Sequence, residues 1–466
     1  MNAADTRELL ARIVKAYDIR AEVQEVPLDL VRAIGAAAAE ELAGGRDRLV
    51  VGRDMRRSSP MWSDAFAEGV CSTGRDVIDL GEVSTDLVSF ASGRLDAAGA
   101  MITASHNPAS YNGIKLCRPG AAPVSLDTGL GAIRERVLLG STMSPDAHPS
   151  EASPRGRRRD RDLLPDFAAH VRSFVSEERL REVRVVVDAG NGMAGRIWPA
   201  VVEGLPILTT PLYFELDGTF PHHPANPLDT ANLEDLRREV RAGSQALGLA
   251  FDGDADRVFA VDERGRPVAS SLVGAAVAER LLERHPGATI LYNLICSRVV
   301  PETVRAAGGT AIRTRVGHSL IKQRMAETDA VFAVEHSGHY YFRDNFRADS
   351  GVIAALVLLE TVAEAGCPLG EVLAPYDRYP GSGERNLAVA DPAVTLAQVR
   401  AHFDAEARDL DEEDGLTISL DDAWFNLRPS NTEPVLRLNV EGDDVAALDR
   451  TLDRVLKVVE QAEAGG

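Results

Sequence analysis

Three aspartates alternate with small residues in one short stretch of the 466-residue chain: Asp252, Asp254 and Asp256. In an extended or turn conformation, side chains two positions apart fall on the same side of the backbone. Three carboxylates crowded in this way repel one another unless a cation lies between them, and hard oxygen ligands suit Mg²⁺ or Mn²⁺. The stretch therefore predicts a divalent-cation site, with a solvated acidic turn as the alternative.

The residues around the aspartates distinguish this stretch from an EF-hand calcium loop. The sixth position of such a loop should be Gly, but here it is Arg257, and the flanking residues 249–251 and 258–261 have strand-like rather than helical patterns. Arg257 instead offers a bidentate guanidinium that could hold a phosphate beside the cation. The pattern thus favours a phosphate ligand next to the metal.

A single serine stands in a polar turn after another predicted strand. Residues 103–108 read Thr-Ala-Ser-His-Asn-Pro, and the small residues before Ser105 would leave its hydroxyl accessible. A serine can carry a phosphoryl group and pass it on, which divides one difficult transfer into two easier steps. His106 and Lys115 could supply charge or a proton nearby. An ordinary turn is the competing interpretation, whereas an acyl nucleophile is disfavoured because the chain has no G-x-S-x-G elbow here.

A polar loop towards the C-terminus has the composition of an anion-binding turn. Between the strand-like residues 422–427 and 435–440, residues 428–434 read Arg-Pro-Ser-Asn-Thr-Glu-Pro. An arginine, two hydroxyls, an amide and several free backbone N–H groups in one turn suit a phosphate. The alternative is an ordinary polar hairpin loop.

A further polar segment, residues 334–339 with the sequence Val-Glu-His-Ser-Gly-His, follows the strand-like residues 330–333. Glu335 and Ser337 lie two positions apart, so both can face a ligand and bind sugar hydroxyls. A zinc site formed by the two histidines of this segment is disfavoured, because the pattern has no helix and no third ligand in register. Residues 317–319, Gly-His-Ser, form one more small polar turn after a strand.

These polar segments depend on a regular alternation of strands and helices. Short apolar runs predict buried strands at residues 100–103, 183–188, 246–251, 289–293 and 330–334. Longer helical patterns predict helices at residues 30–42, 60–72, 231–241, 273–284 and 351–363. The alternation favours α/β units with mixed or parallel sheets, in which ligands gather beyond the carboxyl ends of the strands. We therefore expect the chemistry at those strand ends.

The composition indicates a multidomain globular protein. Hydrophobic residues make up 45% of the chain, and the formal net charge of -20 gives no general attraction for nucleic acid or anionic lipid. No apolar run is long enough for a transmembrane helix, and the four cysteines are scattered without a C-x-x-C pair. We expect a soluble cytoplasmic protein that binds neither nucleic acid nor membrane. An anionic substrate would then need a local cluster of cationic groups.

Taken together and in this order, the segments resemble the α-D-phosphohexomutase family, which includes phosphomannomutases, phosphoglucomutases and phosphoglucosamine mutases. The resemblance runs from Lys15 to about Val440 and begins with residues 17–20, Tyr-Asp-Ile-Arg. Each segment alone is weak evidence for the family, but the occurrence of all of them in the family's order is highly specific to it. The family implies an α/β fold of four domains round a central cleft: three similar mixed-sheet domains and a C-terminal α+β domain.

The resemblance gives a role to each matching residue. It implies a phosphorylated Ser105, one Mg²⁺ ion, and a hexose 1,6-bisphosphate as intermediate and activator. The implied metal ligands are Ser105, Asp252, Asp254 and Asp256. The implied catalytic residues are Ser105, Arg20, Lys115 and His106, and His318 is expected to help stabilise charge. The implied substrate contacts are Tyr17, Arg257, Gly317, His318, Glu335, Ser337, His339, Arg428, Ser430, Asn431 and Thr432.

We expect four domains, at residues 1–150, 151–262, 263–376 and 377–466. They carry, in order, the serine, aspartate, glutamate and arginine segments described above. Residues 140–162 are polar and contain a short basic run at residues 155–159. Because acidic residues are interleaved with it, we interpret this stretch as a solvated linker rather than a nucleic-acid patch.

The expected activity is the interconversion of hexose 6-phosphate and hexose 1-phosphate through phospho-Ser105. Glu335-His336-Ser337 resembles the phosphomannomutases, so mannose is the first expected sugar and glucose the second. A phosphoglucosamine mutase, a non-catalytic phosphosugar-binding homologue and a phosphatase stay open as alternatives. The expected partner is a phosphorylated hexose, and the protein is expected to be a monomer or dimer.

Overall fold

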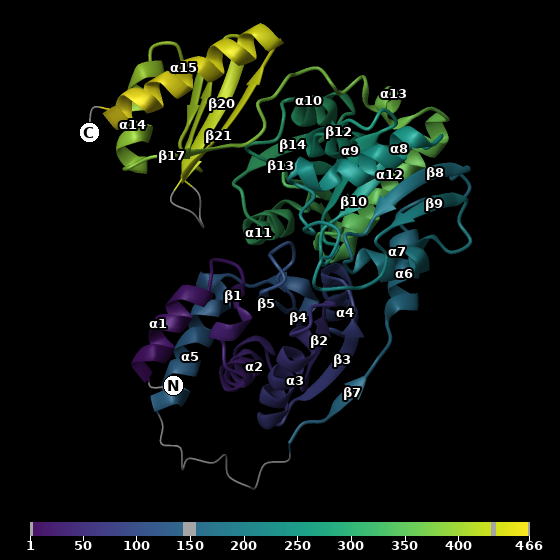
Figure 1. The fold of residues 1–466 in the computed structure, drawn as a ribbon, viewed down its shortest axis with the longest axis vertical. Helices are drawn as coiled ribbons and strands as arrows, with labels where there is room; N and C mark the ends of the chain where they lie inside the picture. Colours follow the sequence, from purple (N-terminus) through teal and green to yellow (C-terminus); the bar gives the residue numbers. More distant parts are fainter. Residues whose placement is uncertain (1–2, 143–154, 430–434, 465–466) are drawn as a thin grey trace.

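The computed structural model describes residues 3–142, 155–429 and 435–464. Within these ranges the chain forms four sheets with helices packed against them, which follow one another along the sequence (Figure 1). The mixed α/β sheets confirm the predicted fold class. No helix in the described part of the chain is both long and apolar enough to span a membrane.

The first domain is built on a seven-stranded sheet in the order β1-β5-β4-β2-β3-β7, with β6 paired to β5. Its strands are β1 (Ile19–Glu22), β2 (Arg48–Arg53), β3 (Asp76–Glu82), β4 (Ala98–Ile102), β5 (Tyr111–Arg118), β6 (Ala122–Pro123) and β7 (Arg158–Asp160). Its helices are α1 (Ala3–Ile13), α2 (Leu28–Leu42), α3 (Ser59–Ser72), α4 (Thr85–Leu95) and α5 (Gly131–Thr142).

Strand β7 corrects the predicted linker at the basic run, while residues 143–154 of that linker lie outside the described residues. Its three residues are exposed, yet they pair in parallel with residues 77–79 of β3. Arg158 donates to Asp79 at 2.7 Å and to Asp64 at 2.5 Å. These partners are distant in sequence, so the local composition could not reveal that the run completes the edge of the first sheet.

The second and third domains each carry a smaller mixed sheet. The second contains β8 (Val183–Asp188), β9 (Ile207–Leu212), β10 (Leu247–Phe251), β11 (Val258–Asp262), β12 (Pro267–Val268), α6 (Leu164–Arg172), α7 (Ala194–Val202) and α8 (Glu234–Ala242). The third contains α9 (Ser270–Arg284), β13 (Thr289–Asn293), α10 (Val299–Ala306), β14 (Thr310–Thr314), α11 (His318–Thr328), β15 (Phe332–Val334), β16 (Tyr340–Phe342), α12 (Gly351–Ala365) and α13 (Leu369–Leu373). Single-turn helical segments lie at Val23–Glu25, Pro119–Ala121, Leu126–Leu130, Thr230–Leu233 and Arg343–Asn345.

The first three sheets share one core topology. Each has a central strand paired in parallel on both sides, and one of its neighbours pairs antiparallel with the next strand of the chain. The equivalent orders are β3-β2-β4-β5, β9-β8-β10-β11 and β14-β13-β15-β16. The hairpins β4–β5, β10–β11 and β15–β16 contain the serine, aspartate and glutamate segments. The repeat thus places three candidate loops at equivalent positions.

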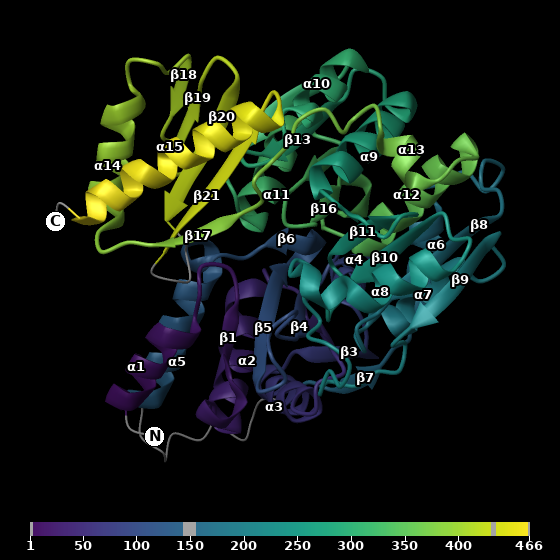
Figure 2. The same ribbon diagram turned by 45° about the horizontal axis from the view of Figure 1, so that its top comes forward.

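The fourth domain is an antiparallel sheet in the order β17-β21-β20-β19-β18 with two helices. Its elements are β17 (Arg385–Ala388), α14 (Pro392–Phe403), β18 (Asp409–Asp411), β19 (Leu416–Ser419), β20 (Ala423–Pro429), β21 (Val435–Gly442) and α15 (Val445–Ala464). Its apolar core is separate, whereas one core runs through the second and third domains and reaches the first. Figures 1 and 2 show the fourth domain as a body of its own.

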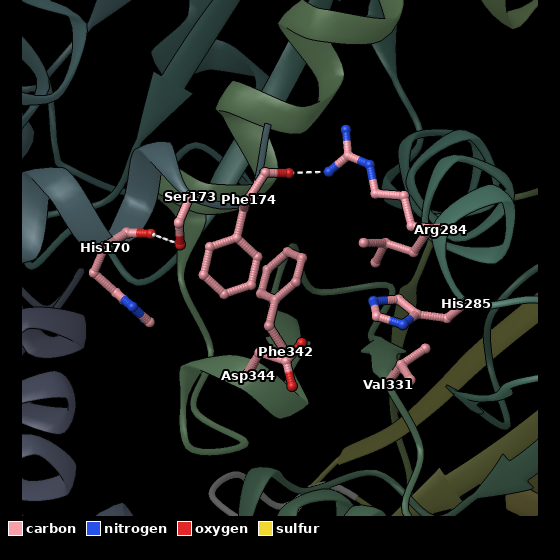
Figure 3. Close-up of a pocket in the computed structure, with 9 residues that line it drawn as sticks. His170, Ser173, Phe174, Arg284, His285, Val331, Phe342 and Asp344 are labelled. Atoms are coloured by element: carbon pink, nitrogen blue, oxygen red, sulfur yellow. Dashed lines mark hydrogen bonds between the residues drawn. The ribbon is translucent and has the colours of Figure 1, made fainter. Parts of the chain in front are cut away.

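A cavity of about 150 Å³ lies between the second and third domains, where α6 meets α9 and the β15–β16 pair (Figure 3). The rings of Phe174 and Phe342 meet edge to face inside it, with centroids 5.5 Å apart. Arg284 closes one side by donating to the Phe174 carbonyl and to Glu360. Val331, which lines the cavity, directly precedes β15. The cavity therefore lies at the opposite end of that strand from the polar hairpin.

Gly69→Ala should destabilise the protein, because α2 and α3 cross at two glycines. A Cβ at Gly69 would lie 2.0 Å from the Arg32 carbonyl oxygen, and one at Gly35 would lie 2.2 Å from that of Phe66. Overpacking of this kind costs about 1–3 kcal/mol, so the thermal midpoint should fall by several degrees. Gly140→Ala is the matched control, because among the described residues no atom beyond its own helix backbone and chain neighbours lies within 4 Å of its added Cβ. Equal midpoints for the two variants in thermal unfolding would contradict the close crossing.

Candidate active site

The aspartate segment forms the turn between β10 and β11. Asp252, Asp254 and Asp256 are 0%, 0% and 2% exposed, and each offers a carboxylate oxygen within 4.8 Å of the other two. One oxygen each of Asp254 and Asp256 is buried without a hydrogen-bond partner among the described residues. Buried carboxylates are costly unless positive charge balances them. The turn therefore has the donor set of a hard divalent cation.

The serine segment lies directly against this turn. Ser105 Oγ donates to Asp252 Oδ2 at 2.7 Å, across 147 positions of sequence. A Cβ added to Gly253 would come within 2.5 Å of the Ser105 carbonyl oxygen, so the approach requires glycine. Ser105 itself has a φ of 51°, a left-handed conformation that costs an ordinary residue about 1 kcal/mol or more. The structure thus brings the predicted phosphoryl carrier and the predicted metal ligands together.

Two cations balance the buried carboxylates. Lys115 Nζ lies 2.7 Å from Asp254 and 2.6 Å from Asp256, and Arg257 donates to Asp252 at 2.8 Å. Burial opposes the charge of Lys115, but Asp254 and Asp256 raise its pKa. Burial raises the pKa of Asp252 to about 7, whereas Lys115 lowers the pKa of Asp254 despite its burial. Lys115 is therefore a fixed positive charge at neutral pH.

Arg20 and His106 complete the surroundings of the serine. Arg20, on β1, donates to Asn107 Oδ1 at 2.5 Å. His106 Nδ1 lies 3.2 Å from Ser105 Oγ and 2.5 Å from Arg257 Nη2. Burial, together with the charges of Arg257 and Arg20, holds the pKa of His106 well below its ordinary value. The imidazole is therefore neutral and within hydrogen-bond reach of the serine hydroxyl.

The glutamate segment forms the hairpin turn between β15 and β16, and it pairs with the end of the aspartate segment. The Val258 N–H donates to the Gly338 carbonyl at 3.3 Å, and Arg257 and His339 form an isolated antiparallel bridge. His339 Nε2 lies 3.9 Å from Asp256. Backbone pairing thus holds the aspartate segment of the second domain and the glutamate segment of the third domain side by side.

Within this hairpin, Glu335 and Ser337 have different surroundings. Glu335 is 3% exposed, and its carboxylate accepts from the Tyr341 hydroxyl at 2.6 Å. Ser337 is only partly buried, and its hydroxyl lies 3.1 Å from His339 Nδ1. Tyr341 therefore orients Glu335, while Ser337 and His339 form the more accessible pair.

Gly317 and His318 stand at the start of α11, against the first domain. A Cβ at Gly317, where φ is 133°, would lie 2.6 Å from the Tyr17 hydroxyl oxygen. The rings of Tyr17 and His318 meet edge to face with centroids 4.9 Å apart. Burial, assisted by the charge of Lys322, lowers the pKa of His318 to about 3. In these surroundings the imidazole of His318 is neutral, and its part in stabilising charge stays a prediction.

Arg428, on β20, is the one predicted substrate contact of the arginine segment that lies within the described residues. It is 3% exposed and donates to Glu384 at 3.0 Å, while its Nε is buried without a partner in the described part of the chain. Glu384 also lies 3.7 Å from His336 and 3.3 Å from Arg437. Burial alone would raise the pKa of Glu384, but interaction with His336 and the charges of Arg437 and Arg428 lower it to about 2. The other predicted contacts of this segment lie outside the described residues: Ser430, Asn431 and Thr432.

Sequence reasoning missed several residues that hold the site. Arg56 and Asp54 form a buried ion pair at 3.1 Å in the turn after β2, directly behind the serine segment. Thr85 donates to Asp254 at 2.6 Å from the start of α4. The polar turn after β2 could have been found by the same strand-end argument as the other loops. No sequence signal marks Thr85 or Glu384, whose partners are more than 40 positions away.

Sequence profiles of one family match the chain domain by domain. The phosphoglucomutase/phosphomannomutase family matches with its α/β/α domains I, II and III at residues 11–138, 165–265 and 270–379, and with its C-terminal domain at residues 384–458. The chain belongs to this family. It is an enzyme of the phosphosugar-mutase class with the four-domain architecture of that class, as the resemblance predicted.

Individual relatives extend over nearly the whole chain. A phosphomannomutase of Salmonella montevideo is 39% identical over 456 residues, which cover 96% of this chain and 98% of the relative. The phosphohexose mutases of Xanthomonas campestris pv. campestris are 38% identical over 440 residues, covering 94% and 96%. The crystal structure of a phosphoglucomutase/phosphomannomutase family protein from Burkholderia thailandensis matches with a TM-score of 0.86 at 30% identity, covering 99% and 98%.

Gly253→Ala should lower turnover while leaving the fold intact. The added Cβ would meet the Ser105 carbonyl oxygen at 2.5 Å and push the serine and aspartate segments apart. A misplacement of about 1 Å between reacting groups costs about 10²-fold, so kcat for hexose phosphate interconversion should fall about 100-fold. A coupled assay measures this, with Gly140→Ala as the control. A parental kcat in Gly253→Ala would show that the approach of the two segments is unimportant.

Proposed function

We propose that the protein interconverts hexose 6-phosphate and hexose 1-phosphate by way of a phosphorylated Ser105. The observation that carries this proposal is the placement of Ser105 Oγ 2.7 Å from Asp252, within a buried cluster of three aspartates. A hydroxyl in this position would carry a phosphoryl group beside a bound cation. Arg257 and Lys115 flank the same point with positive charge, which supplies the local attraction for an anion that the net charge of the chain does not.

We assign one Mg²⁺ ion to Asp252, Asp254 and Asp256, with the oxygen of Ser105 as a further ligand. The fit is supported by the oxygen-only donor set and by the two buried carboxylate oxygens that have no partner among the described residues. Such an ion, when bound, would withdraw charge from the phosphoryl oxygens during transfer.

The side chains around Ser105 have different roles in the proposed phosphoryl transfer. A sugar hydroxyl attacks the phosphorus of phospho-Ser105 and loses its proton, the bond from phosphorus to Oγ breaks, and Oγ takes up one proton, so that no net proton is gained or lost. Lys115 keeps its proton because its pKa is raised, so it stabilises charge together with Arg257 and Arg20. His106 is neutral, and its Nδ1 lies 3.2 Å from Oγ and 2.5 Å from Arg257 Nη2, so it is an acceptor there and orients the serine hydroxyl.

In this proposal the third and fourth domains bind the far end of the sugar phosphate. Glu335, Ser337 and His339 bind hydroxyls, and Arg428 grips the distal phosphate. A hexose 1,6-bisphosphate must then turn round so that its other phosphate returns to Ser105. The fourth domain has its own apolar core and meets the third through polar contacts such as Arg298 with Glu441 at 3.1 Å. It could therefore release and grip the sugar without breaking a shared core, on a timescale of about μs–ms.

Mannose is the proposed main sugar, with glucose as the second. The curated relatives that match over nearly the full length are phosphomannomutases and phosphohexose mutases. Glu335-His336-Ser337 is also the combination that resembles phosphomannomutases. Activity as a phosphoglucosamine mutase is the alternative to be tested against this assignment.

Ser105→Ala should lose nearly all activity, because the variant has no oxygen to carry the phosphoryl group. We expect kcat/KM to fall by about 10³-fold or more, and hexose 1,6-bisphosphate should no longer phosphorylate the protein. The measurement is a coupled assay with mannose, glucose and glucosamine phosphates, paired with mass spectrometry of the protein. Ser173→Ala, at an exposed serine in the second domain, is the control. Full activity in Ser105→Ala would refute the mechanism, and no turnover of any sugar by the parent would favour a binding protein.

Removal of divalent cations should abolish turnover, and Mg²⁺ should restore it. In Asp254→Asn the aspartate cluster loses one charged ligand, so the Mg²⁺ concentration for half-maximal rate should rise at least about tenfold. Titration of the EDTA-treated enzyme with Mg²⁺ measures this constant. Asp29→Asn is the control, because the Asp29 side chain is 93% exposed and far along the chain from the cluster. Undiminished turnover in excess EDTA would argue against the metal.

A further inference from the structure

Arg56 lies behind the serine segment and is among the largest fully buried side chains of the described residues. Its guanidinium donates to four backbone carbonyls of one loop. The bonds run to the carbonyl oxygens of Ser105 at 2.8 Å, Asn107 at 2.6 Å, Pro108 at 2.7 Å and Tyr111 at 3.0 Å. Three carbonyls of the loop between β4 and β5, and that of the first residue of β5, are therefore bound to a single side chain.

Asp54 fixes the guanidinium from the other side. Its Oδ2 accepts from Arg56 Nε at 3.1 Å, and its Oδ1 accepts from the Arg56 N–H at 3.0 Å and from the Ser59 hydroxyl at 2.5 Å. Burial raises the pKa of Asp54, and the charge of Arg56 opposes that rise. The Asp54 N–H donates to the Ile102 carbonyl at 3.0 Å, so the pair is anchored to the ends of β2 and β4.

The second domain closes over this pair. The Phe220 ring lies over the guanidinium, with its centroid 5.0 Å from Arg56 Cζ. A Cβ at Gly218 would lie 2.4 Å from Arg56 Cα, so the backbone of this loop packs on that of Arg56. Arg56 is thus enclosed between the first two domains.

We propose that Arg56, held by Asp54, is a positioning residue that sets the direction of the Ser105 hydroxyl. This rests on the proposed function of Ser105 as phosphoryl carrier. Ser105 occupies a left-handed conformation with φ of 51°, which persists only where the surroundings over-determine it. The guanidinium draws the Ser105, Asn107 and Pro108 carbonyls to one side of the loop. These bonds hold the left-handed backbone of Ser105, which fixes where the hydroxyl leaves the loop, 2.7 Å from Asp252.

Lysine cannot replace arginine in this role. Its ammonium group keeps the charge beside Asp54, but it is a compact donor of three N–H bonds and lacks the planar fork that reaches four carbonyls. In Arg56→Lys the loop should loosen while the sugar-binding hairpin and Arg428 stay in place. We expect kcat to fall about 10–100-fold, the range that small misplacements of reacting groups produce. KM for the hexose phosphate should change by less than about twofold, because groups that bind the substrate are untouched.

The experiment compares Arg56→Lys with Arg172→Lys. Arg172 is a matched control because it also donates to three backbone carbonyls, those of Ala200 at 3.2 Å, Val201 at 2.7 Å and Glu203 at 2.6 Å, at the end of α7. The readouts are kcat, KM, the thermal midpoint, and the single-turnover rate at which phospho-Ser105 passes its phosphoryl group to a hexose phosphate. We expect the single-turnover rate to fall only in Arg56→Lys, and the thermal midpoint reports how far each variant is destabilised.

A parental single-turnover rate in Arg56→Lys, or equal losses in both variants, would overturn the proposal. If Arg56→Lys does not fold, Phe220→Leu is the second test of the positioning role. Leucine keeps an apolar side chain over Arg56 but removes the aromatic ring that lies over the guanidinium. A severalfold lower kcat with parental KM in Phe220→Leu supports the positioning role, and a parental kcat overturns it. Failure of the proposed function would look different, since Ser105→Ala would then retain activity whatever the Arg56 variants do.

Discussion

Ser105 and Asp252 approach to 2.7 Å from loops 147 positions apart, and both side chains are withdrawn from solvent. This contact constrains the rest of the site. It requires glycine at position 253, where a Cβ would meet the Ser105 carbonyl oxygen at 2.5 Å. It also requires positive charge beside the buried carboxylates, which Lys115 and Arg257 supply from two different domains. The fold therefore has to bring the β4–β5 and β10–β11 hairpin turns of the first two domains against each other.

The strongly negative charge of the chain and its proposed anionic substrate are compatible because the cationic groups are local. With a net charge of -20, long-range attraction cannot gather a sugar phosphate. The arginines and the lysine near Ser105 are instead partly or fully buried beside carboxylates, where charge is screened little by salt. At the other end, Glu384 holds Arg428 by an ion pair of 3.0 Å. Each cation is thus oriented by a carboxylate before any substrate arrives.

The sequence predicted the elements best where the signal was local. Residues 183–188 and 289–293 were predicted as strands from short apolar runs, and they match β8 and β13. The strand-end argument then led to the serine, aspartate and glutamate loops. It did not reveal β7, whose pairing with β3 depends on distant partners, or the neutral state of His318, which depends on burial in the folded chain. Local pattern identified the loops, while charge state and support depended on tertiary contacts.

The threefold repeat explains how these loops are supported. In each of the first three domains, a residue at or just beyond the end of the central strand contacts the hairpin that carries candidate site residues. Arg56, after β2, binds the carbonyls of the serine hairpin. Met193, just beyond β8, donates its N–H to the Gly253 carbonyl of the aspartate hairpin at 2.9 Å. Asn293, at the end of β13, lies 3.2 Å from His336 in the glutamate hairpin. One sheet topology thus provides both an outer reactive loop and an inner supporting turn, and the three repeats differ in the side chains they place there.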